Sequence, residues 1–179
     1  MCTFNLRLLR ITVALLVSAC AGMACRRAEK EPAAIAAVDS GEFFGALAPA
    51  DQVRIVGAPD GADVAEVVRD ARARAKSERR ELLVYVGATW CEPCKRFHEA
   101  ANRGELDKAF PNLTLIEFDL DRDRERLLVA GYTMKMIPYF DVPNEDGRAS
   151  PRKMEGSVKG EGAVSEIAPR LRALVVPGG

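Results

Sequence analysis

Two cysteines, Cys91 and Cys94, stand two residues apart in the sequence Trp-Cys-Glu-Pro-Cys-Lys. Residues 81–87 before them are a short apolar run rich in β-branched and aromatic side chains, which predicts a buried strand. Residues 95–101 after them predict a helix. Near a helix N-terminus, unpaired backbone N–H groups and the helix dipole favour an anion, so the first sulfur should ionise readily. Because the thiolate attacks disulfides, the pair is predicted to work by thiol–disulfide exchange.

Further segments make the chain resemble the thioredoxin family, whose redox signature is a C-x-x-C at a strand-to-helix junction. Residues 118–121 resemble the end of the family's third strand, residues 132–138 the loop to its cis-proline, and Gly156 a glycine of its last strand. The resemblance covers residues 51–176. It implies an α/β thioredoxin fold, in which a single domain has a mixed central sheet flanked by helices.

The dithiol itself is similar to that of membrane-tethered extracytoplasmic reductases of cytochrome c maturation, and the rest of the domain to periplasmic electron-relay proteins. The resemblance implies that Cys91, usually the exposed sulfur in this fold, is the nucleophile and that Cys94 resolves the mixed disulfide. It also implies a substrate groove at Ile137 and Pro138, with a cis bond between them that lets the preceding backbone pair with a substrate chain.

Four neighbours of the dithiol are predicted to tune it. Pro93 falls in the first helical turn, where proline sacrifices no useful N–H group. Glu92 places a negative charge beside the developing thiolate and opposes ionisation, whereas Lys95 favours it; Trp90 can shield the sulfurs. A less stabilised thiolate makes the disulfide harder to reduce, which favours a reductant or isomerase over an oxidase. The alternatives are that Glu92 is a solvated charge without effect and that Trp90 is a core residue.

Two positions depart from thioredoxin itself. Tyr85, six residues before Cys91, stands where thioredoxin has a buried aspartate that helps to deprotonate the inner cysteine. A phenol, whose unperturbed pKa is about 10, is a poor base. His98 and Glu99 are therefore candidate replacements. Tyr139 follows the expected cis-proline where thioredoxin has threonine, which should change the substrate groove.

The N-terminus predicts export and lipid anchoring. Two arginines precede an apolar stretch at 11–17. This stretch is too short to span a membrane, which needs about 20 apolar residues, but it suits a signal peptide. Residues 17–20 resemble the bacterial lipobox, which implies that Cys20 is lipidated and becomes the new N-terminus. The alternative is an ordinary signal peptide cut near Ala24.

The predicted organisation is a lipoprotein signal peptide at 1–19, a lipid-anchored flexible tether at 20–50 and a thioredoxin-like domain at 51–179. Several acyl chains would anchor the protein stably. The expected location is the periplasmic face of the cell envelope. Ala21, rather than aspartate, follows the lipidated cysteine, which by the resemblance points to the outer membrane.

Hydrophobic periodicity predicts the order β-α-β-α-β-α-β-β-α. In the last helix, Pro169 favours a start near Ser165, because proline does least harm in a first turn. The expected strands are 52–57, 81–87 and 113–118 and a hairpin of 138–142 with 151–155; the expected helices are 62–77, 94–101, 123–130 and 164–175.

Charge and composition narrow the function. The chain has 26 basic and 26 acidic residues and no basic patch interleaved with aromatic residues, so nucleic acid is not an expected partner. We predict an envelope thiol–disulfide oxidoreductase of the protein-disulfide reductase type, with no cofactor and no metal. Its partners would be thiols and disulfides of envelope proteins, for example apocytochrome c or a disulfide isomerase, with a separate protein as electron donor. The alternative is an adaptor or metallochaperone that holds a client or copper through the same dithiol.

Overall fold

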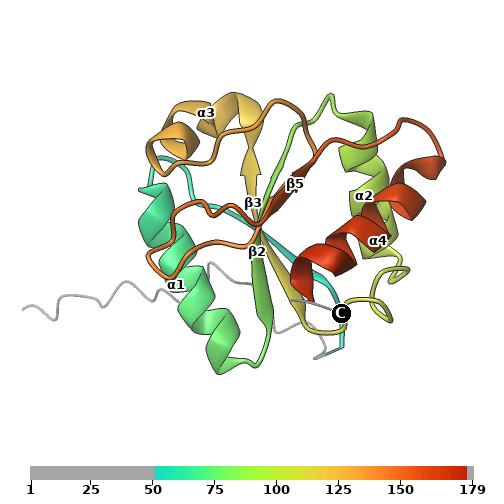
Figure 1. The fold of residues 1–179 in the computed structure, drawn as a ribbon, viewed down its shortest axis with the longest axis horizontal. Helices are drawn as coiled ribbons and strands as arrows, with labels where there is room; N and C mark the ends of the chain where they lie inside the picture. The colour runs from blue at the N-terminus through green and yellow to red at the C-terminus, as the bar shows by residue number, and fades with distance from the viewer. Residues whose placement is uncertain (1–50, 177–179) are drawn as a thin grey trace, which may run out of the picture. The chain divides into compact units, whose positions relative to one another are not determined.

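The computed structural model describes residues 51–176, which form a five-stranded sheet with helices on both faces (Figure 1). The predicted signal peptide, the predicted tether and Cys20 lie outside the described residues. The strands are β1 (Arg54–Gly57), β2 (Glu81–Gly87), β3 (Leu113–Asp119), β4 (Tyr139–Asp141) and β5 (Lys153–Glu155), and the helices are α1 (Val64–Ser77), α2 (Glu92–Asn102), α3 (Leu120–Val129) and α4 (Gly162–Val175).

The sheet has the strand order β1-β3-β2-β4-β5. Strands β1 and β2 run parallel to β3, whereas β4 is antiparallel to β2 and β5 is antiparallel to β4. Gly87 at the end of β2 pairs with Asp119 at the end of β3, and Val86 pairs with Tyr139 at the start of β4. The segments that follow β2 and β3 and the segment that precedes β4 therefore meet at one edge of the sheet. The dithiol and Pro138 lie at this edge.

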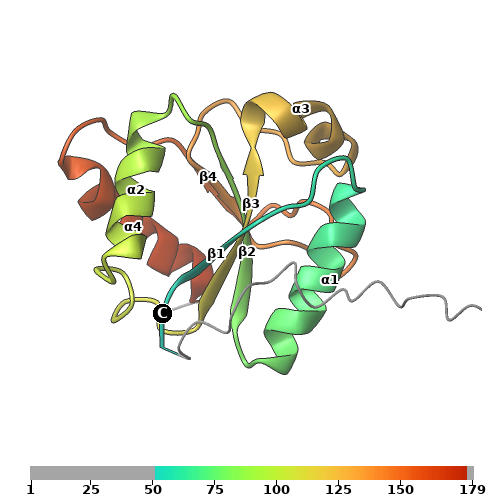
Figure 2. The same ribbon diagram turned by 180° about the vertical axis from the view of Figure 1, so that it is seen from behind.

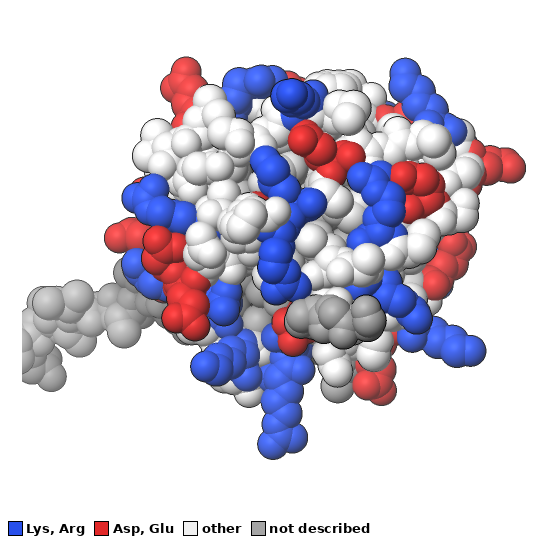
Figure 3. Space-filling model, viewed as in Figure 1, with Lys and Arg blue, Asp and Glu red and all other residues white. Residues whose placement is uncertain are grey.

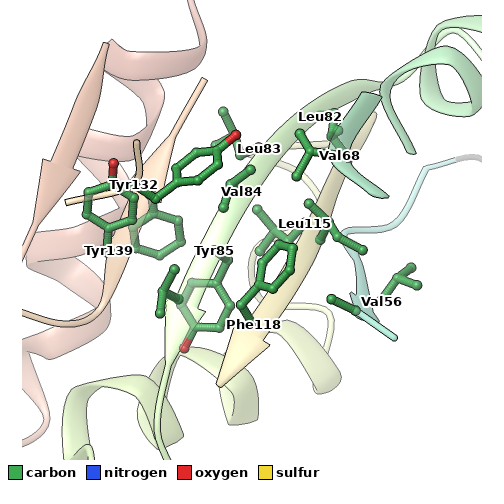
Figure 4. Packing of buried hydrophobic residues seen from close by; sticks show 14 of the residues in the cluster. Val56, Val68, Leu82, Leu83, Val84, Tyr85, Leu115, Phe118, Tyr132 and Tyr139 are labelled. Atoms are coloured by element: carbon green, nitrogen blue, oxygen red, sulfur yellow. The ribbon is translucent and has the colours of Figure 1, made fainter. Parts of the chain in front are cut away.

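Helices α1 and α3 cover one face of the sheet, and α2 and α4 cover the other, as the two opposite views show (Figures 1 and 2). Strand β2 lies at the centre, and all of its residues after Glu81 are buried. Its side chains pack with those of β3, α1 and the β4 region (Figure 4). Burial on both sides explains why the strand reads as a continuous apolar run rather than an alternating one.

Aspartates set the start of two helices. The Asp63 side chain accepts a hydrogen bond from the Glu66 N–H (2.9 Å), so α1 begins at Val64. The Asp119 side chain accepts the N–H groups of Asp121 (2.9 Å) and Arg122 (3.1 Å), so α3 begins at Leu120, directly after β3. The predicted start at residue 123 was wrong. The Asp119 side chain satisfies otherwise unpaired N–H groups and so lets the helix begin three residues earlier.

The last helix begins earlier than predicted. Helix α4 starts at Gly162, which places Pro169 in the interior of the helix rather than in its first turn. An interior proline loses one backbone hydrogen bond and costs about 3 kcal/mol. Ala163, Ile167 and Leu171 are fully buried on one side of the helix, and their packing outweighs this cost.

The described surface mixes charges of both signs, as the view of one face shows (Figure 3). None of the helices within residues 51–176 is both long and apolar enough to cross a bilayer. The predicted element order and the mixed sheet flanked by helices are confirmed.

Candidate active site

Cys91 and Cys94 form a disulfide at the N-terminus of α2, with an S–S distance of 2.05 Å and Cα atoms 5.2 Å apart. Cys91 is the N-cap residue of the helix, and its sulfur accepts a hydrogen bond from the Cys94 N–H at 3.2 Å. A negative charge on this sulfur would therefore face a backbone N–H group and the positive end of the helix dipole. The geometry matches the thiolate stabilisation that the sequence predicted.

The expectation that Cys91 is the exposed sulfur does not hold in this oxidised state. Cys91 is 4% exposed and Cys94 is 3% exposed. Both cysteines pack against the core at the helix terminus. Burial therefore does not distinguish the two cysteines, whereas the N-cap position of Cys91 does.

Glu92 and Pro93 occupy the first turn of α2. One Glu92 oxygen accepts the Gly160 N–H (3.0 Å) and the other accepts Arg96 Nε (3.0 Å). The Gly160 hydrogen bond and, after it, the Arg96 guanidinium lower the pKa of the Glu92 carboxyl. Glu92 is thus ionised, but Arg96 offsets its charge. The carboxylate also ties the dithiol turn to the segment before α4, a contact that sequence reasoning missed.

Trp90 and Lys95 both lie at the surface. Trp90 is 62% exposed, and its Nε1 donates a hydrogen bond to Asp121 Oδ2 at 2.8 Å. The interpretation of Trp90 as a core residue is therefore wrong. Trp90 directly precedes Cys91 in the sequence, and its hydrogen bond to the first turn of α3 fixes the orientation of the indole. Lys95 follows Cys94 and is exposed.

The Ile137–Pro138 peptide bond is cis, as predicted. Pro138 is buried and Ile137 is half-buried. A cavity of about 370 Å³ lies between Trp90 and the loop of residues 134–137, with Gly156 also in its wall. Exposed Met136 and Trp90 give this cavity an apolar rim, which suits an extended peptide segment beside the dithiol.

Glu155 holds this loop in place. Its carboxylate accepts the backbone N–H groups of Lys135 (2.6 Å) and Met136 (3.0 Å). Burial alone would raise the pKa of Glu155, but these two hydrogen bonds outweigh it and lower the pKa. Sequence reasoning missed this residue, because no local pattern links the end of β5 to a loop far earlier in the chain.

The two candidate proton acceptors lie in different surroundings. Glu99 is exposed and faces Arg103 on the outer side of α2, with 3.9 Å between charged atoms. His98 is half-buried, and its Nε2 lies 2.8 Å from Glu117 Oε1 of β3. Tyr85 is fully buried, and burial, with a smaller effect of the Glu117 carboxylate, raises its pKa further above the ordinary value. The phenol therefore stays protonated, as expected of a poor base.

Metal-ligating side chains are not grouped in the described part of the chain. Within residues 51–176, no three His, Cys, Asp or Glu side chains are arranged to hold a metal ion.

A redox-closed C-x-x-C at a helix N-terminus, beside a cis-proline loop and on a mixed sheet between two layers of helices, defines a thioredoxin-fold dithiol protein. The family model for thioredoxin matches residues 65–168, more than half of the chain. The chain therefore belongs to the thioredoxin family. No curated protein matches the chain.

Solved structures similar to this chain are also thioredoxins. Oxidised thioredoxin O1 from Arabidopsis thaliana is 19% identical, with 60% of this chain and 87% of that chain covered and a TM-score of 0.38. A mutant thioredoxin from Halobacterium salinarum is 15% identical, with 73% and 93% covered and a TM-score of 0.42. Trichomonas vaginalis thioredoxin is 23% identical, with 59% and 86% covered and a TM-score of 0.38.

Proposed function

We propose that this thioredoxin-like thiol–disulfide oxidoreductase is a protein-disulfide reductase of the cell envelope. The observation that carries its redox role is the position of Cys91, whose sulfur caps α2 and accepts the Cys94 N–H at 3.2 Å. This arrangement favours the thiolate of Cys91, which is the attacking form.

The exchange would proceed in two displacements. The Cys91 thiolate attacks one sulfur of a client disulfide, forms a mixed disulfide and expels the other client sulfur as a thiolate. Cys94 then loses its proton and attacks the Cys91 sulfur, which breaks the bond to the client. The client leaves fully reduced, and the Cys91–Cys94 disulfide seen in the structure is formed.

Glu92 supports the reducing direction. Its carboxylate lies in the first turn of α2, immediately after Cys91, where a negative charge opposes a second one on the sulfur. The effect is limited, because Arg96 bonds the same carboxylate and Glu92 is accessible to solvent. A modestly destabilised thiolate keeps the potential lower than that of a strong oxidant.

The proposed location rests on the sequence before the described domain. The apolar stretch at 11–17 and the lipobox-like residues 17–20 support export and lipidation at Cys20, which would hold the domain at the periplasmic face of the outer membrane. Its proposed partners are thiols and disulfides of envelope proteins, for example apocytochrome c or a disulfide isomerase. The electrons would come from a separate protein.

Insulin reduction in the presence of dithiothreitol tests the activity. Cys91→Ser should abolish turnover, because it removes the nucleophile. Cys94→Ser should instead accumulate mixed disulfides with clients from an envelope extract, because the resolving thiol is absent. Undiminished turnover of Cys91→Ser would overturn the mechanism. A measured potential close to that of strong oxidants, about −120 mV, would overturn the reductase assignment.

A further inference from the structure

We propose that His98, held by Glu117, accepts the proton that Cys94 must lose before it resolves the mixed disulfide. This inference rests on the proposed function and names the groups that replace the missing buried aspartate. His98 is the proton acceptor, and Glu117 is a positioning residue that orients the imidazole.

A cavity connects the residues involved. It has a volume of about 420 Å³ and is lined by Cys94 and His98 of α2, Tyr85 of β2 and Glu117 of β3, among others. His98 lies one turn after Cys94 on the same helix, so the two side chains project from neighbouring positions on one face. A proton can pass between them directly or through one water molecule, for which the cavity has ample room.

The strand pairing explains how Glu117 reaches this place. Tyr85 and Glu117 are paired neighbours on β2 and β3, so Glu117 enters the wall of the cavity beside the position that the aspartate would occupy. The side chains of His98 and Glu117 are each 31% exposed, and their charged atoms are 2.8 Å apart. At this distance the Glu117 carboxylate can hold the imidazole ring in a fixed orientation.

The residues that surround His98 come from three elements and from the segment that follows β2. Cys94 and exposed Lys95 lie on α2, Tyr85 on β2, and Glu117 and Asp119 on β3, while the segment after β2 contributes Ala88 and Thr89. The Tyr85 phenol stays neutral. The charged side chains in the cavity wall are therefore the Glu117 and Asp119 carboxylates and the Lys95 ammonium group.

Tyr85 cannot accept the Cys94 proton, but its side chain forms part of the cavity wall. Its ring contacts the imidazole with centroids 5.4 Å apart. Its hydroxyl points away from those of Tyr132 and Tyr139 (Figure 4) and has no hydrogen-bond partner among the described residues. The buried hydroxyl therefore takes no part in the proposed proton transfer, and the Tyr85 side chain only forms part of the cavity wall.

Neutral His98 takes the proton of the Cys94 thiol, and the resulting thiolate attacks the Cys91 sulfur of the mixed disulfide. The Cys91–Cys94 bond forms, the bond to the client sulfur breaks, and the client leaves as a thiolate. The proton then passes from the imidazolium to the client thiolate or to water.

Oxidation of the reduced protein by excess oxidised glutathione separates the two displacements. Formation of the mixed disulfide depends on glutathione concentration, whereas resolution does not. Acid quenching followed by intact-mass measurement counts the glutathionylated intermediate directly, and the fluorescence of Trp90, the only tryptophan, follows the same reaction continuously.

His98→Gln keeps a hydrogen-bonding side chain opposite Glu117 but cannot accept a proton near neutral pH. We expect its resolution rate at pH 7 to fall by about tenfold or more, as for loss of a general base, with glutathionylation changed by less than about twofold. The wild-type resolution rate should fall as the pH is lowered, because a protonated imidazole cannot accept the Cys94 proton. This pH dependence should be absent in His98→Gln.

Glu117→Gln should slow resolution less than His98→Gln does, because the imidazole loses the carboxylate that orients it, and it should keep the pH dependence that His98→Gln loses. Glu99→Gln, on the outer side of the same helix, is the matched control and should leave both rates and the pH profile unchanged. An unchanged resolution rate or pH profile in His98→Gln would overturn the proposal. A wild-type protein that does not glutathionylate at Cys91 would instead refute the proposed function.

Discussion

Gly147→Ala should destabilise the domain far more than alanine at another left-handed glycine. Gly147 lies between β4 and β5 with φ +80°, and an added Cβ would overlap the Ala65 carbonyl oxygen and lie 2.9 Å from Arg69 N, both backbone atoms of α1. Backbone atoms cannot rotate away as a flexible side chain can. The segment must therefore move off α1, although β4 and β5 hold its two ends in the sheet.

The expected magnitude has three parts. An alanine in the left-handed region costs about 1–2 kcal/mol. Overpacking adds about 1–3 kcal/mol when the neighbours can shift, and more when they cannot. The Gly147 carbonyl accepts a hydrogen bond from the buried Tyr132 hydroxyl at 2.7 Å, and leaving that hydroxyl unpaired costs about 1–3 kcal/mol. We expect a loss of roughly 3–8 kcal/mol, a large fraction of the about 5–15 kcal/mol that holds a typical domain folded.

Gly61→Ala is the matched control. Gly61 has φ +71°, but its added Cβ would meet nothing within 4 Å, so only the backbone penalty of about 1–2 kcal/mol applies. Urea denaturation of the two oxidised variants gives both free energies of unfolding. If Gly147→Ala lowers the free energy of unfolding no more than Gly61→Ala does, the conclusion that this segment packs closely against α1 is wrong. If Gly147→Ala does not fold at all while Gly61→Ala does, the reasoning is supported.

Three further outcomes are expected. Glu92→Gln should raise the reduction potential of the dithiol by about 10–30 mV, measured against a glutathione buffer, because Arg96 is then unopposed; a fall in potential would contradict this. Burial alone would raise the pKa of Asp123, but hydrogen bonds from Arg122, Arg126 and the Asp119 N–H outweigh it and lower the pKa, so its stabilising contribution is present at neutral pH and lost as pH falls through that lowered pKa. Asp123→Asn should therefore cost about 2–3 kcal/mol at pH 7 and much less near pH 2 in urea titrations; an equal cost at both would be inconsistent. Cys20→Ala should release the protein from the membrane fraction with its insulin reduction intact, and continued detergent-phase partitioning would place the anchor elsewhere.

Most of the fold could be predicted because its core segments carry strong local signals. The apolar run of β2 and the amphipathic stripe of α1 match the observed elements, with β2 at the predicted residues and α1 two residues shorter at its start. The dithiol and the cis-proline could be found in the same way, because each is a short motif whose chemistry depends on neighbouring residues. The ends of the elements were less predictable, since they depend on capping residues. Asp119, for example, is both the last residue of β3 and the N-cap of α3.

Pro169 shows where a local rule loses to packing. Proline favours a first turn, and a helix that started near Ser165 would have satisfied this preference. In the structure, Ala163 precedes that point and is fully buried, as are Ile167 and Leu171 further along α4. Starting the helix at Gly162 brings all three onto one inward face. The preference of a single residue is worth less than this burial, and the sequence alone does not reveal how closely the sheet approaches.

The site was harder to predict where function is shared between segments. The sequence shows at once that Tyr85 cannot act as the missing aspartate. It offers His98 and Glu99 as candidate replacements but does not reveal Glu117, which reaches the cavity only through the parallel register that pairs it with Tyr85. A bulky tyrosine fits there since Gly87 has no side chain: a Cβ would lie 2.8 Å from the tyrosine hydroxyl. These features belong together: β2 carries Tyr85 in place of the acid, with room made by Gly87, while β3 carries Glu117 and α2 carries His98. In the proposed mechanism the carboxylate that assists Cys94 therefore lies on β3 instead of β2 and acts through the His98 imidazole.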